Sequence, residues 1–212
     1  MRILGLDEAG RGSVLGPLVV GAYLHETDDL DRAWTTLRAA GADDSKALTA
    51  RRRDAAREAL AALGTGAVRV ITPAQIDAGN LNELEEHAFL ELVAALRPDA
   101  VWLDAPVHPR GIPAVRARLI ARSGVRDWVI EPKADATWPV VGAASIWAKT
   151  TRDAAIAALG PGVGSGYPSD PVTRAWLLAR IRENAPLPAC VRSRWETVES
   201  LRQGSLFGDA DG

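Results

Sequence analysis

Short apolar runs alternate along the chain with longer segments in which apolar residues recur every three or four positions. Short runs bounded by glycine are typical of buried strands, whereas the longer periodic segments are typical of helices. Helical segments separate most of the apolar runs, so we expect an α/β fold with a mixed sheet and helices on both faces. The predicted strands cover 2–7, 17–24, 68–71, 100–103 and 128–130.

Capping residues and prolines mark where the helices begin. Pro139 falls in the first turn of a long helix opened by Thr137-Trp138, where its missing N–H costs nothing. The helix that starts at Asn82 carries Leu84, Ala88, Leu92 and Leu96 on one face. Helices are predicted at 49–63, from Thr72, from Asn82, near 111–122, from Thr137, at 171–183 and at 191–202.

A glycine-rich segment at 160–166 separates the α/β part from an all-helical end. The sequence therefore predicts a main domain at 1–160, a small C-terminal helical cap at 161–202 and a flexible tail at 203–212.

Composition places the chain among soluble globular proteins, with 47% hydrophobic and 25% charged residues. No apolar run approaches the roughly 18 residues of a membrane span, and the acidic start argues against a signal peptide. A lone Cys190 suits a reducing cytoplasm. The 3 histidines are far apart and match no zinc spacing. We therefore expect a cytoplasmic protein with no membrane partner and no zinc.

The net charge of −2 does not by itself favour a nucleic-acid ligand. Arginines nevertheless concentrate near the C-terminus, and such a local basic stripe attracts phosphates even on an acidic protein. An ordinary solvated helix face explains the same pattern equally well. The basic stripe consists of Arg174, Arg180, Arg182, Arg192 and Arg194.

Acidic residues follow two predicted strands and precede the long helix. Asp7 and Glu8 end the first strand, Asp104 ends the strand at 100–103, and Asp135 lies just before the long helix. Taken singly, each is more often a turn or cap residue. Together, at strand ends where ligands gather, they favour a site for divalent cations. Oxygen ligands without His or Cys select Mg²⁺ or Mn²⁺.

Other candidates could contact a sugar–phosphate chain or serve structure alone. Gly10-Arg11-Gly12 is a turn, and its glycines also permit close backbone approach to a ligand. Tyr167 lies in a rigid loop, where an aromatic ring either packs in the core or stacks on a base or sugar. Three basic side chains either bind phosphates or remain solvated: Lys46, Lys149 and Arg152.

These motifs, in this order, resemble ribonuclease HII over about residues 1–195. The resemblance rests on the joint occurrence of the first motif, the helix motif and the tyrosine loop. The matching segments are Asp7-Glu8-Ala9-Gly10-Arg11-Gly12, Asp44-Ser45-Lys46, Leu103-Asp104, Lys133-Ala134-Asp135, Ala143-Ala144-Ser145-Ile146-Trp147-Ala148-Lys149, Arg152-Asp153 and Gly164-Ser165-Gly166-Tyr167-Pro168-Ser169-Asp170-Pro171.

The resemblance implies a ribonuclease H-like fold and an endoribonuclease that uses two Mn²⁺ or Mg²⁺ ions. The carboxylates of Asp7, Glu8, Asp104 and Asp135 would hold the ions. One ion would activate a water and the other would stabilise the leaving 3′ oxygen. The substrates implied are RNA–DNA hybrids and duplex DNA with single ribonucleotides, cut on the 5′ side of the ribonucleotide to give 3′-hydroxyl and 5′-phosphate ends.

The resemblance also assigns recognition roles. Gly10-Arg11-Gly12 would bind the ribose 2′-hydroxyl through the backbone, which distinguishes RNA from DNA. Tyr167 would stack on the sugar of the following deoxynucleotide. Ribonuclease HIII has a glutamate as its fourth carboxylate, so Asp135 favours HII. Trp147 replaces a smaller aliphatic residue, which should change packing and leave the chemistry unaltered.

Two other functions stay open on the sequence alone. One is a resolvase-type ribonuclease H-like nuclease acting on DNA junctions, which the glycine turn and Tyr167 disfavour. The other is a non-catalytic nucleic-acid-binding module, which would be expected to have lost a carboxylate.

The predicted tail contains Gln203, Leu206 and Phe207. The pattern Gln-x-x-Leu-Phe resembles the short peptide by which bacterial replication and repair proteins dock on the DNA sliding clamp. Glutamine would supply hydrogen bonds and the Leu-Phe pair would fill an apolar pocket. Alternatively, Leu206 and Phe207 fold back onto the cap.

Overall fold

The structure is a computed structural model that describes residues 1–42 and 48–207, the last three of them by backbone only. The chain forms two compact units, and both are discontinuous in sequence. The sequence predicted a single division at residue 160, whereas the second unit also takes in two segments from the N-terminal half. Unit 1 contains 1–9, 19–69 and 85–151, and unit 2 contains 10–18, 70–84 and 152–212.

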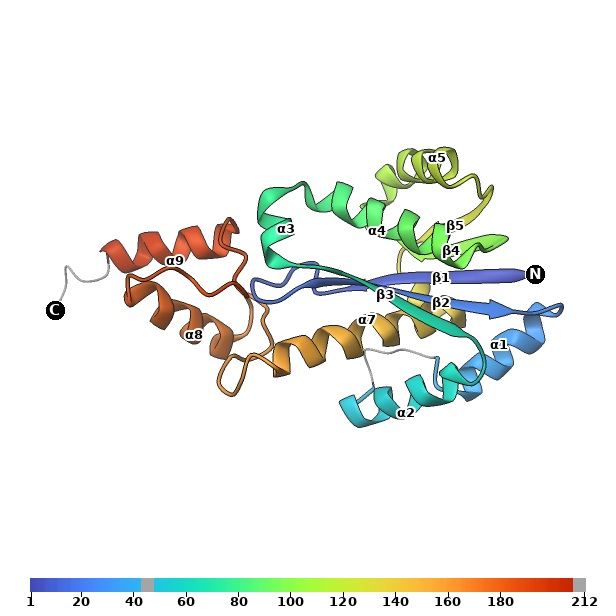
Figure 1. The fold of residues 1–212 in the computed structure, drawn as a ribbon, viewed down its shortest axis with the longest axis horizontal. Helices are drawn as coiled ribbons and strands as arrows, with labels where there is room; N and C mark the ends of the chain where they lie inside the picture. The colour runs from blue at the N-terminus through green and yellow to red at the C-terminus, as the bar shows by residue number, and fades with distance from the viewer. Residues whose placement is uncertain (43–47, 208–212) are drawn as a thin grey trace. The chain divides into compact units, whose positions relative to one another are not determined.

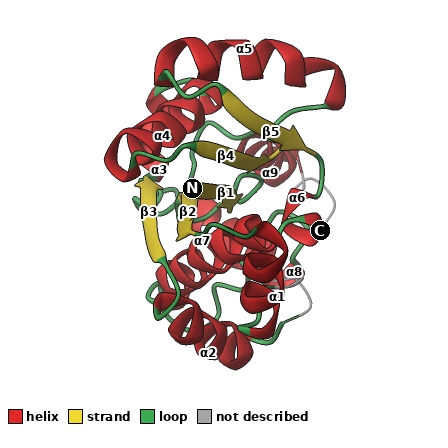
Figure 2. Ribbon diagram, turned by 90° about the vertical axis from the view of Figure 1, so that its right-hand side faces the viewer, coloured by secondary structure: helices red, strands yellow, loops and turns green. Residues whose placement is uncertain are grey.

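A mixed five-stranded sheet, in the order β3-β2-β1-β4-β5, forms the centre of the fold among the described residues (Figures 1 and 2). β1 pairs antiparallel with β2 and parallel with β4, and β4 pairs parallel with β5. The predicted mixed sheet is therefore confirmed. The strands are β1 (Arg2–Ala9), β2 (Leu18–Glu26), β3 (Thr65–Ile71), β4 (Ala100–Asp104) and β5 (Asp127–Glu131).

The long helix α7 (Pro139–Ala157) packs its backbone directly against the sheet. A Cβ added to Gly5 would lie 2.0 Å from the carbonyl oxygen of Val140, and one added to Gly21 would lie 2.2 Å from that of Ala144. Glycine is thus required on β1 and β2 so that helix and sheet can approach. Because side chains alternate along a strand, Asp7 lies on the same face of β1 as Gly5.

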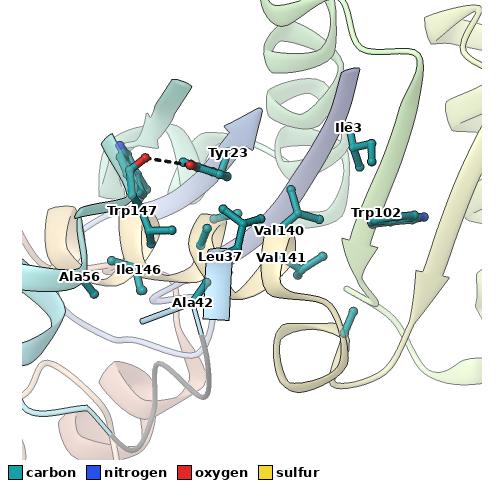
Figure 3. Close-up of a cluster of buried hydrophobic side chains, with 14 residues drawn as sticks. Ile3, Tyr23, Leu37, Ala42, Ala56, Trp102, Val140, Val141, Ile146 and Trp147 are labelled. Atoms are coloured by element: carbon teal, nitrogen blue, oxygen red, sulfur yellow. Dashed lines mark hydrogen bonds between the residues drawn. The ribbon is translucent and has the colours of Figure 1, made fainter. Parts of the chain in front are cut away.

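Buried side chains from α7 and the sheet form a core on this face (Figure 3). Trp147 packs against Tyr23 with ring centroids 5.3 Å apart, and Tyr23 donates a hydrogen bond to the carbonyl of Leu60. A Cβ on Gly66 would meet the indole of Trp147 at 1.9 Å, so the large side chain fits because β3 carries a glycine there. Trp147 is 6% exposed and serves packing, as predicted.

Helices α4 (Leu81–Leu96) and α5 (Ile112–Ser123) cover one side of the sheet (Figures 1 and 2). The opposite side is covered by α1 (Leu30–Ala39), α2 (Ala50–Ala61) and α7. The buried stripe of α4 is centred on Ala88, Phe89, Leu92 and Val93. Of the predicted face, Ala88 and Leu92 are buried, and Leu84 and Leu96 near the ends of the helix are half-buried.

Capping residues place several helices where the sequence predicted them. Thr49 caps α2 (Ala50–Ala61), and Thr72 forms a capping box with Gln75 before α3 (Pro73–Ala78). Helix α1 (Leu30–Ala39) was not predicted, although it is amphipathic and is capped by Asp29. Only Ala33 and Leu37 are buried on its inner face, and among the charged residues around them these two do not form a recognisable apolar pattern.

Unit 2 has its own apolar core, which includes Val14, Leu15, Leu177 and Val198. Its two long helices, α8 (Pro171–Arg182) and α9 (Glu196–Phe207), pack on each other (Figure 1). α8 begins at Pro171 behind the N-cap Asp170, as predicted.

The predicted final helix at 191–202 was wrong at both ends. Val191 instead forms a bridge with Leu15, and α9 runs from Glu196 to Phe207, so 203–207 belong to a helix and not to the predicted flexible tail. A helix continues through Gly204 because one interior glycine costs only about 1 kcal/mol. Within the described residues, no helix is long and apolar enough to cross a membrane.

Candidate active site

Asp7, near the end of β1, is the centre of the acidic group in unit 1. Its side chain is 4% exposed, and it accepts a hydrogen bond from the backbone N–H of Glu8 at 2.8 Å. Burial raises the pKa of Asp7, and the nearby charges of Asp104 and Asp135 raise it as well, to about 7. A hydrogen bond from Ser145 and the charge of Lys149 oppose the rise. Asp104 and Asp135 are thus close enough to Asp7 to act on its charge, and the predicted role of the three aspartates as metal ligands stays a prediction.

Asp104 and Asp135 are held by a shared local arrangement. Asp104 ends β4, and its Oδ1 accepts a hydrogen bond at 2.9 Å from the backbone N–H of Ala134. Ala134 begins the short helix α6 (Ala134–Thr137), which carries Asp135 in its first turn. Lys133, before the helix, has the left-handed φ of 60° that turns the chain into it. Asp135 thus lies in a separate short helix, which directly precedes the predicted long helix.

Ser145 is a member of the site that sequence reasoning did not select. It lies on α7, is fully buried, and accepts a hydrogen bond from Lys149 Nζ at 2.8 Å. Its own hydroxyl group bonds to Asp7, so the three residues form a chain from cation to carboxylate. The signal was present in the sequence: Ser145 interrupts an otherwise apolar helix face, four residues before a lysine.

Glu8 leaves β1 on the other face of the sheet from Asp7, because successive side chains alternate. It is half-buried. Its predicted role as a fourth metal ligand stays a prediction.

The acidic group has the chemistry of a site for hard divalent cations. Its ligand atoms are carboxylate oxygens, which Mg²⁺ and Mn²⁺ prefer. Within residues 1–42 and 48–207, no three His, Cys, Asp or Glu side chains already stand close enough to hold one ion. The charges of Asp104 and Asp135 nevertheless raise the pKa of the buried Asp7 carboxylate, so a cation beside Asp7 would be stabilising.

Gly10-Arg11-Gly12 forms a tight turn in unit 2. The N–H of Ser13 donates to the carbonyl of Gly10 at 3.2 Å, which closes the turn. Gly10 has a φ of +85°, and a Cβ there would lie 2.6 Å from the carbonyl oxygen of Pro17. Glycine is therefore required at this position. The side chain of Arg11 is directed to Asn82, with Nη2 2.5 Å from the amide oxygen.

Tyr167 and Arg152 pack together in the same unit. The guanidinium of Arg152 lies 4.4 Å from the ring centroid of Tyr167, and Arg152 is 5% exposed. Arg152 also donates to Ser13 Oγ at 2.9 Å and to the carbonyl of Ser165. It therefore joins the tyrosine loop to the segment that follows the glycine turn. These contacts favour a supporting role for Arg152, and its predicted phosphate contact stays a prediction.

Two sets of predicted residues are outside what the structure describes. Lys46 lies between the described ranges, and nothing is described of the side chains of Leu206 and Phe207. Gln203 is exposed near the end of α9.

The mixed sheet, its long crossing helix and the aspartates at its strand ends define a nuclease of the ribonuclease H-like class. The comparisons with known proteins agree. Over residues 4–198 the chain matches the family model described as ribonuclease HII. It is 42% identical to the ribonuclease HII of Hyperthermus butylicus over 95% of this chain and 85% of that protein.

Solved structures give the same result. Ribonuclease H2 from Pyrococcus horikoshii has a TM-score of 0.84 at 36% identity, covering 96% of this chain and 98% of that one. Ribonuclease HII from Archaeoglobus fulgidus, solved in complex with PCNA, has a TM-score of 0.82 at 37% identity, covering 95% and 97%. The chain belongs to the ribonuclease HII family. It is an endoribonuclease, so neither the resolvase nor the non-catalytic alternative holds.

Proposed function

We propose that this chain cuts the phosphodiester on the 5′ side of ribonucleotides, both in RNA–DNA hybrids and where single ribonucleotides lie in duplex DNA. The ends produced are a 3′-hydroxyl and a 5′-phosphate. The observation that carries the proposal is the buried Asp7 carboxylate beside the charges of Asp104 and Asp135, in a member of the ribonuclease HII family. Its cellular task would be the removal of ribonucleotides from DNA in the cytoplasm.

We further propose that two Mn²⁺ or Mg²⁺ ions work in this site, held by Asp7, Glu8, Asp104 and Asp135. The donor set fits such ions, because its ligand atoms are carboxylate oxygens and the buried Asp7 lies near the negative charges of Asp104 and Asp135. When bound, the ions supply Lewis acidity, which makes a water nucleophilic at neutral pH and stabilises the leaving oxygen.

The residues of the chain prepare the site for this chemistry. A pKa of about 7 means that Asp7 exchanges a proton near neutral pH, and the proton must leave before both oxygens can act as ligands. The Lys149–Ser145 pair lies on α7 beside Asp7 and offsets part of its charge. The hydrogen bond from the N–H of Ala134 fixes the orientation of the Asp104 carboxylate.

Substrate recognition is assigned to unit 2. Gly10-Arg11-Gly12 would contact the ribose 2′-hydroxyl through its backbone, and Tyr167 would stack on the next deoxyribose. Ala9 alone separates Glu8 from this turn in the sequence, so the proposed ribose contact directly follows the end of β1. Phosphates would be bound by basic side chains that include Lys46 and Lys149.

We also propose that the C-terminal segment docks on a DNA sliding clamp through Gln203, Leu206 and Phe207. The related ribonuclease HII from Archaeoglobus fulgidus was solved in complex with PCNA, which supports a clamp as the partner. A docking peptide raises the effective concentration of the enzyme on DNA without using the catalytic surface.

The experiment that tests the catalytic proposal is Asp7→Asn, assayed on an RNA–DNA hybrid with Mn²⁺ or Mg²⁺. Cleavage should be abolished while duplex binding survives or improves, because phosphate contacts come from other side chains. The matched control is Asp28→Asn, an exposed aspartate, which should cut as the wild type does. If Asp7→Asn retains activity within about tenfold of wild type, the loss of at least 1.4 kcal/mol expected at a metal ligand is absent and the site assignment fails.

A further inference from the structure

We propose that Arg192 is a positioning residue for ribose recognition, because its guanidinium holds the carbonyl groups of the Gly10-Arg11-Gly12 turn in one orientation. The inference rests on the proposed function, in which this turn contacts the 2′-hydroxyl. Arg192 was one of five arginines in the basic stripe, which the sequence assigned either to phosphate binding or to a solvated surface. It is neither, since its side chain is fully buried in unit 2.

Each nitrogen of the Arg192 side chain donates to a different backbone carbonyl. Nη2 lies 2.6 Å from the oxygen of Gly10, and Nη1 lies 3.0 Å from that of Arg11. Nε lies 3.1 Å from the carbonyl oxygen of Gly16, on the return path of the same segment. One rigid, planar group therefore fixes both ends of the loop that contains the turn.

Peptide geometry converts these contacts into an orientation for the hydrogen-bond donors. In a planar trans peptide the carbonyl and the N–H point in opposite directions. The carbonyls of Gly10 and Arg11 point at Arg192, so the N–H groups of Arg11 and Gly12 point away from it. A cation at the oxygen end of a peptide also polarises the N–H at its other end, which makes it a better donor. Arg192 thus aims and strengthens the two donors next to the proposed ribose contact.

The backbone around Arg192 is held as firmly as its side chain. The N–H of Arg192 donates to the carbonyl of Val14 at 3.0 Å, and the N–H of Gly16 donates to the carbonyl of Cys190 at 2.8 Å. The ring of Trp195 lies 4.9 Å from the guanidinium. The carboxylate of Asp77 accepts hydrogen bonds from the N–H and the hydroxyl of Ser193, both at 2.7 Å. Hydrogen bonds therefore also fix the backbone segment that carries the guanidinium.

Burial of this cation has a cost, which its partners offset. Burial and the charge of Arg152 lower the pKa of Arg192 to about 10, and Tyr167 and Asp77 oppose this shift. Arg192 consequently remains protonated at neutral pH. A fully buried cation with three backbone partners is a costly way to pack a core. Fixing a recognition turn explains why the position carries an arginine.

The test is Arg192→Lys, which keeps the charge but loses the planar fork, so one nitrogen must replace three. Affinity is measured for two matched duplexes, one with a single ribonucleotide and one of DNA alone, in an Asp7→Asn background that does not cut. The ratio of the two dissociation constants is the ribose selectivity. We expect Arg192→Lys to reduce this selectivity by about three- to tenfold, the worth of one net hydrogen bond, with little change for the DNA duplex. The control is Arg202→Lys, an exposed arginine of unit 2, which should leave both constants unchanged.

These measurements distinguish failure of the positioning role of Arg192 from failure of ribose recognition by the turn. If the protein with Arg192 intact does not distinguish the two duplexes, ribose recognition by the turn fails, whatever Arg192 does. If that protein distinguishes them and Arg192→Lys distinguishes them equally well, the positioning role is wrong. Equal weakening on both duplexes also contradicts it, because a purely structural or phosphate-binding residue would act on both alike.

A second variant covers the case in which Arg192→Lys does not fold. Asp77→Ala removes the carboxylate that holds Ser193 and Arg194 but leaves the buried arginine in place. Its selectivity should fall in the same direction by a smaller factor, because the segment that delivers Arg192 becomes looser. Unchanged selectivity in a folded Asp77→Ala protein would overturn the proposal.

Discussion

Asp104 accepts a hydrogen bond from the N–H of Ala134, and this contact ties the end of β4 to the residue that precedes Asp135. One carboxylate of the site thereby positions the backbone that carries another. The left-handed Lys133 makes the turn possible at a cost of about 1–2 kcal/mol, which the surrounding structure must offset. Strain of this kind is common where the backbone must present functional groups.

The stability of the metal-free protein should fall as pH rises through neutrality. Burial and neighbouring carboxylates raise the folded-state pKa of Asp7 from 3.8 to about 7. The stability associated with its protonated form is therefore fully present below pH 3.8 and is lost as pH rises to about 7. Asp7→Asn mimics the protonated form, so it should remove this loss, worth up to about 4 kcal/mol at pH 8.

Urea unfolding with EDTA at pH 4.5 and pH 8 measures this effect. The free energy of unfolding of Asp7→Asn should exceed that of wild type by more at pH 8 than at pH 4.5. Asp28→Asn should show no such dependence on pH. An equal effect of Asp7→Asn at both pH values would mean that folding does not raise the pKa of Asp7.

Tyr167→Ala should weaken cutting at single ribonucleotides more than cutting of a long RNA–DNA hybrid. Loss of one stacking contact costs about 1–3 kcal/mol, and a long hybrid offers alternative registers that a single junction lacks. Tyr167→Phe keeps a ring above Arg152 and should retain most of the activity. The measurement is kcat/KM on both substrates for both variants. Equal losses on the two substrates would show that Tyr167 packs unit 2 and does not sense the junction.

Gly66→Ala should destabilise the protein by about 1–3 kcal/mol, because the new methyl group meets the Trp147 indole. In a Trp147→Leu background the same substitution should cost much less, since the obstructing ring is gone. A double-mutant cycle of unfolding free energies measures the coupling. Additive effects would contradict the packing described here between β3 and α7.

The C-terminal segment should bind a DNA sliding clamp, and the double variant Leu206→Ala/Phe207→Ala should lose this binding. The reason is that the two apolar side chains would fill a pocket on the clamp. Calorimetric titration of the clamp with each protein measures the loss, and unfolding of both proteins by urea provides the control. If the two proteins bind alike, or if the double variant loses several kcal/mol of folding stability, these residues belong to the fold.

Local features of this fold could be predicted from the sequence, and long-range ones could not. Thr49, Thr72 and Asp170 mark helix starts because a cap is a local hydrogen bond within four residues. The assembly of unit 2 from three separate segments depends on contacts such as the bridge from Leu15 to Val191, which no local pattern encodes.

The same distinction holds for the site. Asp7 and Asp104 could be expected to meet because parallel strands end at the same edge of a sheet. The burial of Arg192 could not be foreseen, because its sequence context resembles that of Arg174 and Arg182, which are exposed. Burial of a charged group depends on partners that are distant in the chain, here the carbonyls of the glycine turn.

The most direct test of the account uses a DNA duplex that contains one ribonucleotide, incubated with the protein and Mn²⁺ or Mg²⁺, beside an all-DNA duplex of the same sequence. We predict one cut on the 5′ side of the ribonucleotide, which leaves a 3′-hydroxyl and a 5′-phosphate, and no cut in the all-DNA duplex. EDTA should stop the reaction. Cleavage of the all-DNA duplex, cleavage that persists in EDTA, or an intact ribonucleotide duplex in the presence of either metal would contradict the proposed function.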